Sequence, residues 1–159
     1  MRHPSAFSLR SDAPAPTLLI RLMVGGVFLS EGIQKFLEPA SRGAGRFVKI
    51  GLPAAEFLGP LVGATEVLCG SLVLFGLLTR IAVLPLIATM VVAIATTKLP
   101  ILLGRSIFGL QLRELSSYGF WSMAHEARTD VAMLLGSLFL LLVGAGPLAL
   151  DAVLIRRRR

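Results

Sequence analysis

The sequence predicts an all-α integral membrane protein built as a four-helix bundle. Two observations on composition support this: 55% of the 159 residues are hydrophobic and only 16% are charged, and the mean hydropathy is +0.80. A soluble domain of this composition would expose much of its core to water. The third observation is that four apolar runs, each about 20 residues long, alternate with polar stretches. We therefore expect one compact bundle and no separate soluble domain.

Prolines, glycines and charges set the expected limits of the four spans. Pro16 and Pro39 flank the first apolar run, where proline suits a helix start and then a helix stop. The polar break at Thr79-Arg80 allows only a tight hairpin, so the second and third spans must be antiparallel neighbours. The spans are expected at about residues 17–37, 54–78, 81–99 and 130–150.

The remaining segments are expected to lie outside the bilayer core. Residues 1–15 are rich in Ser, Pro and Ala and are predicted to form a disordered N-terminal tail. Residues 100–129 carry the aromatic run YGFW and are predicted to form a loop on the membrane interface. Residues 152–159 form a basic C-terminal tail.

The net charge of +7 is explained by the membrane rather than by nucleic acid. Arg156–Arg159 directly follow the last span, where basic residues are attracted to anionic lipid headgroups. Basic residues are almost equally divided between the two ends of the spans, so the positive-inside rule alone is indecisive. The terminal arginine run favours both termini on the cytoplasmic side of a bacterial inner (plasma) membrane. Nothing in the sequence indicates an oligomeric state.

Metal and thiol chemistry have no support in the sequence. Cys69 is the only cysteine and falls inside an apolar run, where a thiol behaves as a small hydrophobe. Dithiol chemistry within this chain is therefore excluded unless a partner supplies the second thiol. His3 and His125 are too far apart for a metal-ligand motif. We expect no metal and no intrinsic cofactor.

Charged residues inside the spans are the candidate functional groups. Such groups are costly in a bilayer, at roughly 3 kcal/mol each, and usually face the bundle interior. Glu31 and Glu66 come out at nearly the same depth, and Lys35 follows Glu31 by one helical turn on the same face. Glu66, Glu31 and Lys35 are the candidate catalytic residues. Lys98 and Asp130 are expected to complete this cluster in the loop-side half of the bundle.

A second charged group is expected at the terminal side, where Asp151 could neutralise Arg21 or Arg80. Paired charges at helix ends often only anchor and orient spans. Trp121 belongs to the aromatic run and is more typical of an interfacial anchor than of a ligand-stacking residue. Candidate residues for holding an amphiphilic cofactor are Arg21, Arg80, Lys98 and Trp121.

A series of sequence motifs runs through the predicted spans. LLIRLMVGGVFLSEGIQKF is followed by a loop ending IGLP, then by GATEVLCGSLVLFGLLTR and a late GAGPLALDA. This order of motifs resembles the DoxX family of small bacterial membrane proteins. The resemblance assigns residues 16–151 to one DoxX-like domain. Its recognisable positions are Arg21, Gly32, Lys35, Phe36, Gly51, Pro53, Glu66, Gly70, Gly76, Thr79, Arg80 and Asp151. Glu31 just before Gly32, and the long aromatic loop, depart from the family's pattern.

The resemblance implies a four-helix bundle and, in some relatives, a link to membrane oxidoreduction. We therefore expect an accessory or quinone-linked subunit of a membrane redox system, with a quinone entering between helices and other redox subunits as partners. One alternative is a small proton-coupled transporter, which would use the buried Glu66 for proton exchange. Another is a non-catalytic scaffold that holds other membrane subunits.

Overall fold

The computed structural model describes residues 13–157, and within that range the chain is helical without a β-strand. The predicted all-α class is thus confirmed. Among these described residues, three helical segments are long and apolar enough to cross a membrane by length and composition. They are α1 (Thr17–Leu37), α3 (Ala55–Phe75) and the run Thr79–Leu103, which combines α4 (Thr79–Ala93), a π-helical turn η1 (Ile94–Lys98) and α5 (Leu99–Leu103).

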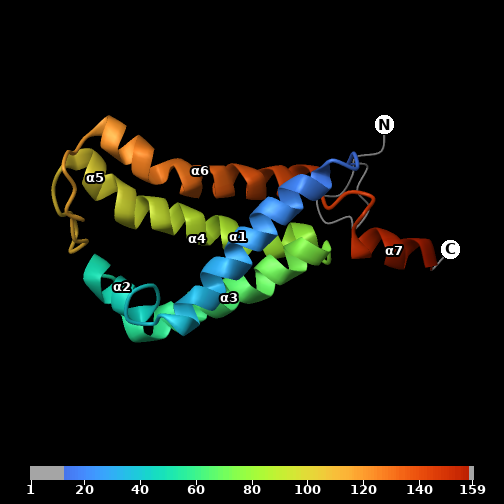
Figure 1. The fold of residues 1–159 in the computed structure, drawn as a ribbon, viewed down its shortest axis with the longest axis horizontal. Helices are drawn as coiled ribbons and strands as arrows, with labels where there is room; N and C mark the ends of the chain where they lie inside the picture. The colour runs from blue at the N-terminus through green and yellow to red at the C-terminus, as the bar shows by residue number, and fades with distance from the viewer. Residues whose placement is uncertain (1–12, 158–159) are drawn as a thin grey trace.

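The fourth long helix, α6 (Phe120–Val143), runs beside α4 and completes the bundle (Figure 1). It begins well before the predicted start at residue 130. Its first turns carry Glu126, Arg128 and Asp130, so only its second half is continuously apolar. Charge pairing and packing against α5 stabilise those first turns as helix, and neither contact is visible in the local hydropathy.

Other boundaries also differ from the expected ones. The predicted interfacial loop at 100–129 is irregular only over residues 104–119, because α5 continues to Leu103 and α6 starts at Phe120. The predicted fourth span does not reach residue 150, since α6 ends at Val143 and the following Gly144, with a φ of +92°, breaks the helix. A short helix α7 (Leu150–Arg157) then covers most of the predicted C-terminal tail. Residues 1–12 and 158–159, where the rest of the two predicted tails falls, lie outside the described residues.

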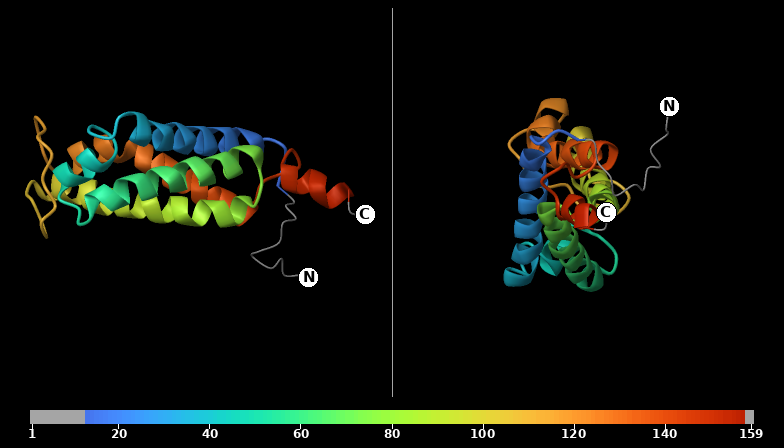
Figure 2. Two further views of the ribbon diagram at one scale, coloured as in Figure 1. Left: turned by 90° about the horizontal axis from the view of Figure 1, so that it is seen from below. Right: turned by 90° about the vertical axis from the view of Figure 1, so that its right-hand side faces the viewer.

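The bundle consists of two helix pairs. α1 packs along α3, α4 packs along α6, and α3 joins the pairs by packing on α4 (Figures 1 and 2). The short helix α2 (Ala44–Ile50) lies against α3 at the end of the bundle that carries the 104–119 loop. We call this the loop end. Thr17 and Gly146 lie close together at the opposite end, the terminal end.

Glycines on facing sides let α1 and α3 approach closely. A methyl group at Gly25 would lie 2.9 Å from the Gly70 carbonyl oxygen, and one at Gly32 would lie 2.8 Å from the Gly63 carbonyl oxygen. Both pairs are seven residues apart along each helix, so they fall on one face. The seven-residue spacing of Gly63 and Gly70 suits close helix packing, and the structure shows that the partner is α1.

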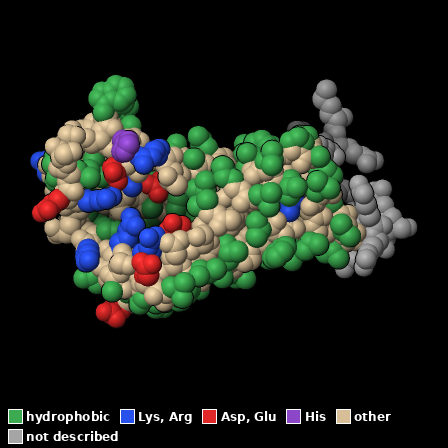
Figure 3. All heavy atoms as spheres, in the orientation of Figure 1, with side chains coloured by type: hydrophobic (Ala, Val, Ile, Leu, Met, Phe, Trp, Pro, Cys, Tyr) green, Lys and Arg blue, Asp and Glu red, His purple; other side chains and the backbone are tan. Residues whose placement is uncertain are grey.

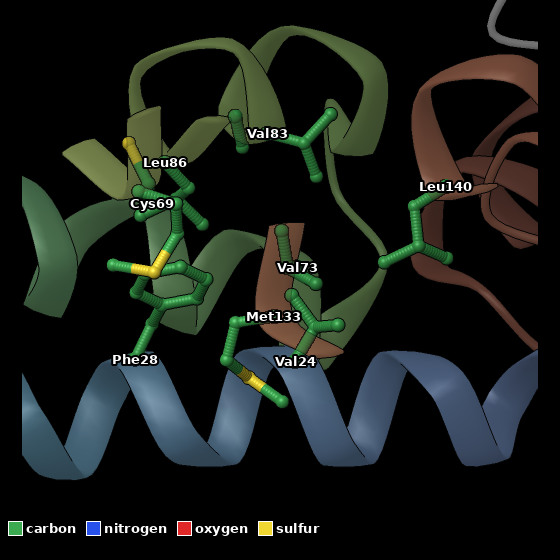
Figure 4. Close-up of a cluster of buried hydrophobic side chains, with 10 residues drawn as sticks. Val24, Phe28, Cys69, Val73, Val83, Leu86, Met133 and Leu140 are labelled. Carbon is green, nitrogen blue, oxygen red and sulfur yellow. The ribbon is translucent and has the colours of Figure 1, made fainter. Parts of the chain in front are cut away.

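One apolar cluster fills the centre where the four long helices meet (Figure 4). It includes Val24 and Phe28 of α1, Val73 of α3, Leu86 of α4 and Leu140 of α6. The free thiol of Cys69 is buried in the same cluster, as its apolar neighbourhood predicted. The charged side chains inside the spans therefore lie towards the two ends, separated by this core.

Candidate functional site

The central feature at the loop end is an ion pair between α1 and α3. Lys35 Nζ donates a hydrogen bond to Glu66 Oε2 at 2.5 Å. The side chains are 11% and 3% exposed, so both charges lie inside the protein. The close contact at Gly32, one turn before Lys35, brings the α1 backbone near enough for the lysine to reach α3. A buried pair is stable only when both partners remain, because either charge alone would be uncompensated.

Glu31 lies beside this pair. Its half-buried carboxylate is close enough to Glu66 to repel it electrostatically, as the depth count from the sequence predicted. Glu31 forms no ion pair with any described residue. Three ionisable groups, Glu31, Lys35 and Glu66, therefore form one cluster within the membrane-spanning helices, in which Lys35 pairs with Glu66 and Glu31 lies beside them. We call it the α1–α3 cluster.

Lys98 and Asp130 form a second pair rather than joining the first. Lys98 Nζ lies 3.0 Å from Asp130 Oδ2, with the lysine nearly buried. The single five-residue cluster expected from the sequence is thus divided into two ion pairs. Each pair belongs to one of the two helix pairs, which separate towards the loop end (Figure 1).

The π-helical turn Ile94–Lys98 sets the direction of Lys98. Pro100 has no backbone N–H to donate to the carbonyl of Thr96, so the regular ladder cannot continue through this point. The wider turn accommodates the missing bond, and Thr97 Oγ1 donates to the Ala93 carbonyl at 2.6 Å. An extra residue in one turn rotates the following side chains around the helix, and such turns are frequent at functional sites.

A cavity of about 360 Å³ opens at the loop end beside Lys98. α2, the π-helical turn, α5 and the 104–119 loop all contribute to its wall. In the space-filling view, basic and acidic side chains lie around a hollow at this end of the molecule (Figure 3). Its lining residues are Ser41, Arg46, Lys49, Ile50, Thr97, Lys98, Ile101, Gln111, Leu112 and Arg113.

Sequence reasoning identified only Lys98 among the basic residues of this cavity. Arg46, Lys49 and Arg113 sit in segments that looked like ordinary polar connections. The signal that could have singled out α2 is Gly59, where a methyl group would lie 2.6 Å from the Ala44 nitrogen. A glycine required by such a close contact shows that the connecting segment is packed onto α3.

At the terminal end, Arg21 serves a different purpose from Lys35. It is buried and donates to the carbonyl oxygens of Val73 and Leu74 at 3.1 and 2.9 Å, at the C-terminal end of α3. It also donates to the carbonyl oxygens of Ala145 and Leu148, both at 3.1 Å, in the segment after α6. All three guanidinium nitrogens are engaged with backbone, so Arg21 ties two helix ends together.

Asp151 and Arg80 complete the terminal end. The Asp151 carboxylate accepts hydrogen bonds from the backbone N–H groups of Leu78 and Thr79 at the start of α4, where a carboxylate stabilises a helix. Burial raises the pKa of Asp151 above its ordinary value, an effect that these N–H groups and the Arg21 charge oppose. Arg80 donates to the carbonyl of Leu142 at 3.2 Å at the end of α6. This end is a set of helix caps.

Trp121 belongs neither to the α1–α3 cluster nor to the helix caps of the terminal end. It lies on the first turn of α6 with its side chain 83% exposed, and its ring meets that of Phe120 edge to face. Phe108, in the adjoining loop, is also fully exposed. Exposed aromatic rings at the end of a membrane bundle suit the lipid headgroup level. No group of histidine, cysteine or carboxylate side chains suited to a metal ion occurs among residues 13–157.

Comparison with known proteins agrees with this architecture. The DoxX family model matches residues 17–99. An uncharacterized membrane protein of Mycobacterium tuberculosis is 51% identical over 94% of this chain and 87% of its own. CatD of Bacillus subtilis, whose name proposes an oxidoreductase, is 32% identical over 90% of each chain. No solved structure matches. With its apolar helices and this resemblance along almost its whole length, the chain belongs to the DoxX family of membrane proteins.

Proposed function

We propose that this DoxX protein is an accessory, quinone-linked subunit of a membrane redox system in the bacterial inner membrane, with both termini in the cytoplasm. The observation that carries the proposal is the α1–α3 cluster, in which the buried Lys35–Glu66 pair lies beside Glu31. The relative whose name proposes an oxidoreductase supports a role in redox chemistry. The other redox subunits would supply the electrons, since this chain has one cysteine and it is buried.

The residues of the cluster fit the head of a quinone. A quinone carbonyl accepts hydrogen bonds, which the Lys35 ammonium group donates, and a hydroquinone hydroxyl donates to a carboxylate such as Glu31. Arg21 fits less well, because its nitrogens already donate to four backbone carbonyls. When bound, the quinone supplies two-electron chemistry that is coupled to two protons. Lys35 would orient the head, and Glu31 and Glu66 would hold and exchange protons at their carboxylate oxygens.

Proton exchange in this cluster follows from its charge balance. Two carboxylates lie near one ammonium group, so a single proton added to either carboxylate leaves the cluster neutral. In this role the cluster would alternate between a net charge of minus one and zero as it exchanges one proton with the quinone. Glu66 is the more buried of the two carboxylates and Glu31 the more accessible, so a proton would reach the surface of α1 through Glu31.

The test compares Glu66→Gln with Glu56→Gln, an exposed glutamate in the first turn of the same helix. Quinone binding to the purified protein and the redox state of the quinone pool in a complemented deletion strain are the two measurements. Glu66→Gln is expected to slow the change in redox state of the quinone pool at least tenfold, as loss of a general acid–base group does. Glu56→Gln is expected to leave that rate unchanged. Absence of quinone binding together with full complementation by Glu66→Gln would disprove the proposal.

A further inference from the structure

We infer that the cavity at the loop end is a binding site for a phosphate-type oxyanion, either free or as the headgroup of an anionic phospholipid. The site is separate from the α1–α3 cluster and does not depend on a redox role. Its wall carries four basic side chains, Arg46, Lys49, Lys98 and Arg113, and no carboxylate. Such a wall attracts an anion and repels a cation.

The charges on the wall divide into paired and unpaired ones. Lys98 is neutralised by Asp130 at 3.0 Å, and Arg113 by Glu126 at 2.8 Å. Arg46 and Lys49 form no ion pair with any carboxylate in residues 13–157, although Arg46 lies within electrostatic range of Glu66. These two side chains therefore bring positive charge to the cavity wall without an ion-pair partner among residues 13–157, and a phosphate group would supply the counter-charge.

The helix that carries Arg46 and Lys49 is held in place by packing, while both side chains are exposed. They are three residues apart on α2 and so share one face of that helix. α2 sits directly on α3 at the Gly59–Ala44 contact. On its other side, the backbone N–H of Gln111 donates to the Ile50 carbonyl at 2.8 Å, which joins α2 to the 104–119 loop. Because the helix is fixed, only the rotation of these two side chains has to be restricted when an anion binds.

The position of the cavity suits a lipid headgroup as well as a free anion. α2 begins after α1 has ended, and Lys98 lies near the loop end of the Thr79–Leu103 span, so the cavity is at the headgroup level. Ile50, Ile101 and Leu112 line the same space and would contact the glycerol or upper acyl part of a phospholipid. A guanidinium group matches two phosphate oxygens at once, which adds specificity to the attraction.

The experiment measures binding of inorganic phosphate to the full chain in neutral detergent, with Arg46→Ala/Lys49→Ala as the test variant. Arg105→Ala/Arg128→Ala is the matched control, because it removes two exposed positive charges that do not line the cavity. The test variant is expected to bind phosphate at least tenfold more weakly than wild type, and the control within twofold of it. The charge-preserving variant Arg46→Lys/Lys49→Arg, whose fold is checked by thermal unfolding, is expected to retain most of the affinity.

A second arm identifies the source of the anion. Phosphatidylglycerol in phosphatidylcholine nanodiscs that displaces inorganic phosphate from the wild-type protein would support the site with a lipid headgroup as its ligand. Phosphate binding that the lipid does not displace would support the site with a soluble oxyanion. Equal losses of affinity in the test and control variants, or no binding of either probe to the wild type, would overturn the inference.

Discussion

Lys35 of α1 and Glu66 of α3 form a buried ion pair across the glycine-lined contact between two membrane-spanning helices. The pair needs that contact, because only a backbone without side chains at Gly32 and Gly63 lets α1 and α3 lie close enough. Glu31 lies beside the pair, so the three groups together carry one more negative than positive charge when both carboxylates are ionised. Packing and electrostatics are therefore coupled at this point of the bundle.

Removing one member of the pair should cost much more than removing both. Lys35→Ala or Glu66→Ala leaves one buried charge without its partner, and each is expected to lower the free energy of unfolding by about 3–5 kcal/mol. The double variant should be less destabilised than the sum of the two. Thermal unfolding in detergent, arranged as a double-mutant cycle, measures the coupling. Additive losses would show that the two side chains do not interact.

Gly32→Ala should destabilise the bundle, whereas Gly26→Ala should not. A methyl group at Gly32 would lie 2.7 Å from the Val67 nitrogen, a backbone atom that cannot move without shifting α3, while nothing lies within 4 Å of one at Gly26. Since alanine is the better helix former by about 1 kcal/mol, Gly26→Ala should be neutral or stabilising. The midpoint of thermal unfolding compares them, and similar losses in both would contradict the close contact.

Arg21→Lys should not preserve the terminal end, despite keeping the charge. Arg21 uses three nitrogens to reach carbonyls in two segments, and a single ammonium group cannot span both. Unpaired carbonyls are expected to lower the free energy of unfolding by at least about 2 kcal/mol. Arg42→Lys, at an exposed pair with Glu38, is the control and should cost less than about 1 kcal/mol. Equal effects would mean that charge alone matters at Arg21.

The two ion pairs of the loop end should differ in strength. Asp130→Asn leaves Lys98 nearly buried without its carboxylate and is expected to cost about 3 kcal/mol. Glu126→Gln acts on Arg113, whose side chain is 65% exposed, and should cost no more than about 1 kcal/mol. Chemical denaturation in mixed micelles can rank the two. A larger loss for Glu126→Gln would contradict the burial of Lys98.

Most of the helical architecture could be predicted from residue patterns alone. Apolar runs of bilayer length identified α1, α3 and the Thr79–Leu103 span, and the spacing of Gly63 and Gly70 indicates a face suited to close packing. Depth along antiparallel helices predicted that Glu31 and Glu66 share a level. These predictions rest on the fixed rise and period of the helix, which are local properties.

Only the tertiary structure decided how the charges pair and where the cavity forms. The separation of Lys98–Asp130 from Lys35–Glu66 depends on which helices pack together, and the start of α6 at Phe120 depends on ion pairs with residues outside that helix. Arg46, Lys49 and Arg113 meet only because α2 docks on α3 and hydrogen bonds to a distant loop. Local periodicity determined the helices of this protein, whereas contacts between residues remote in sequence determined its charged sites.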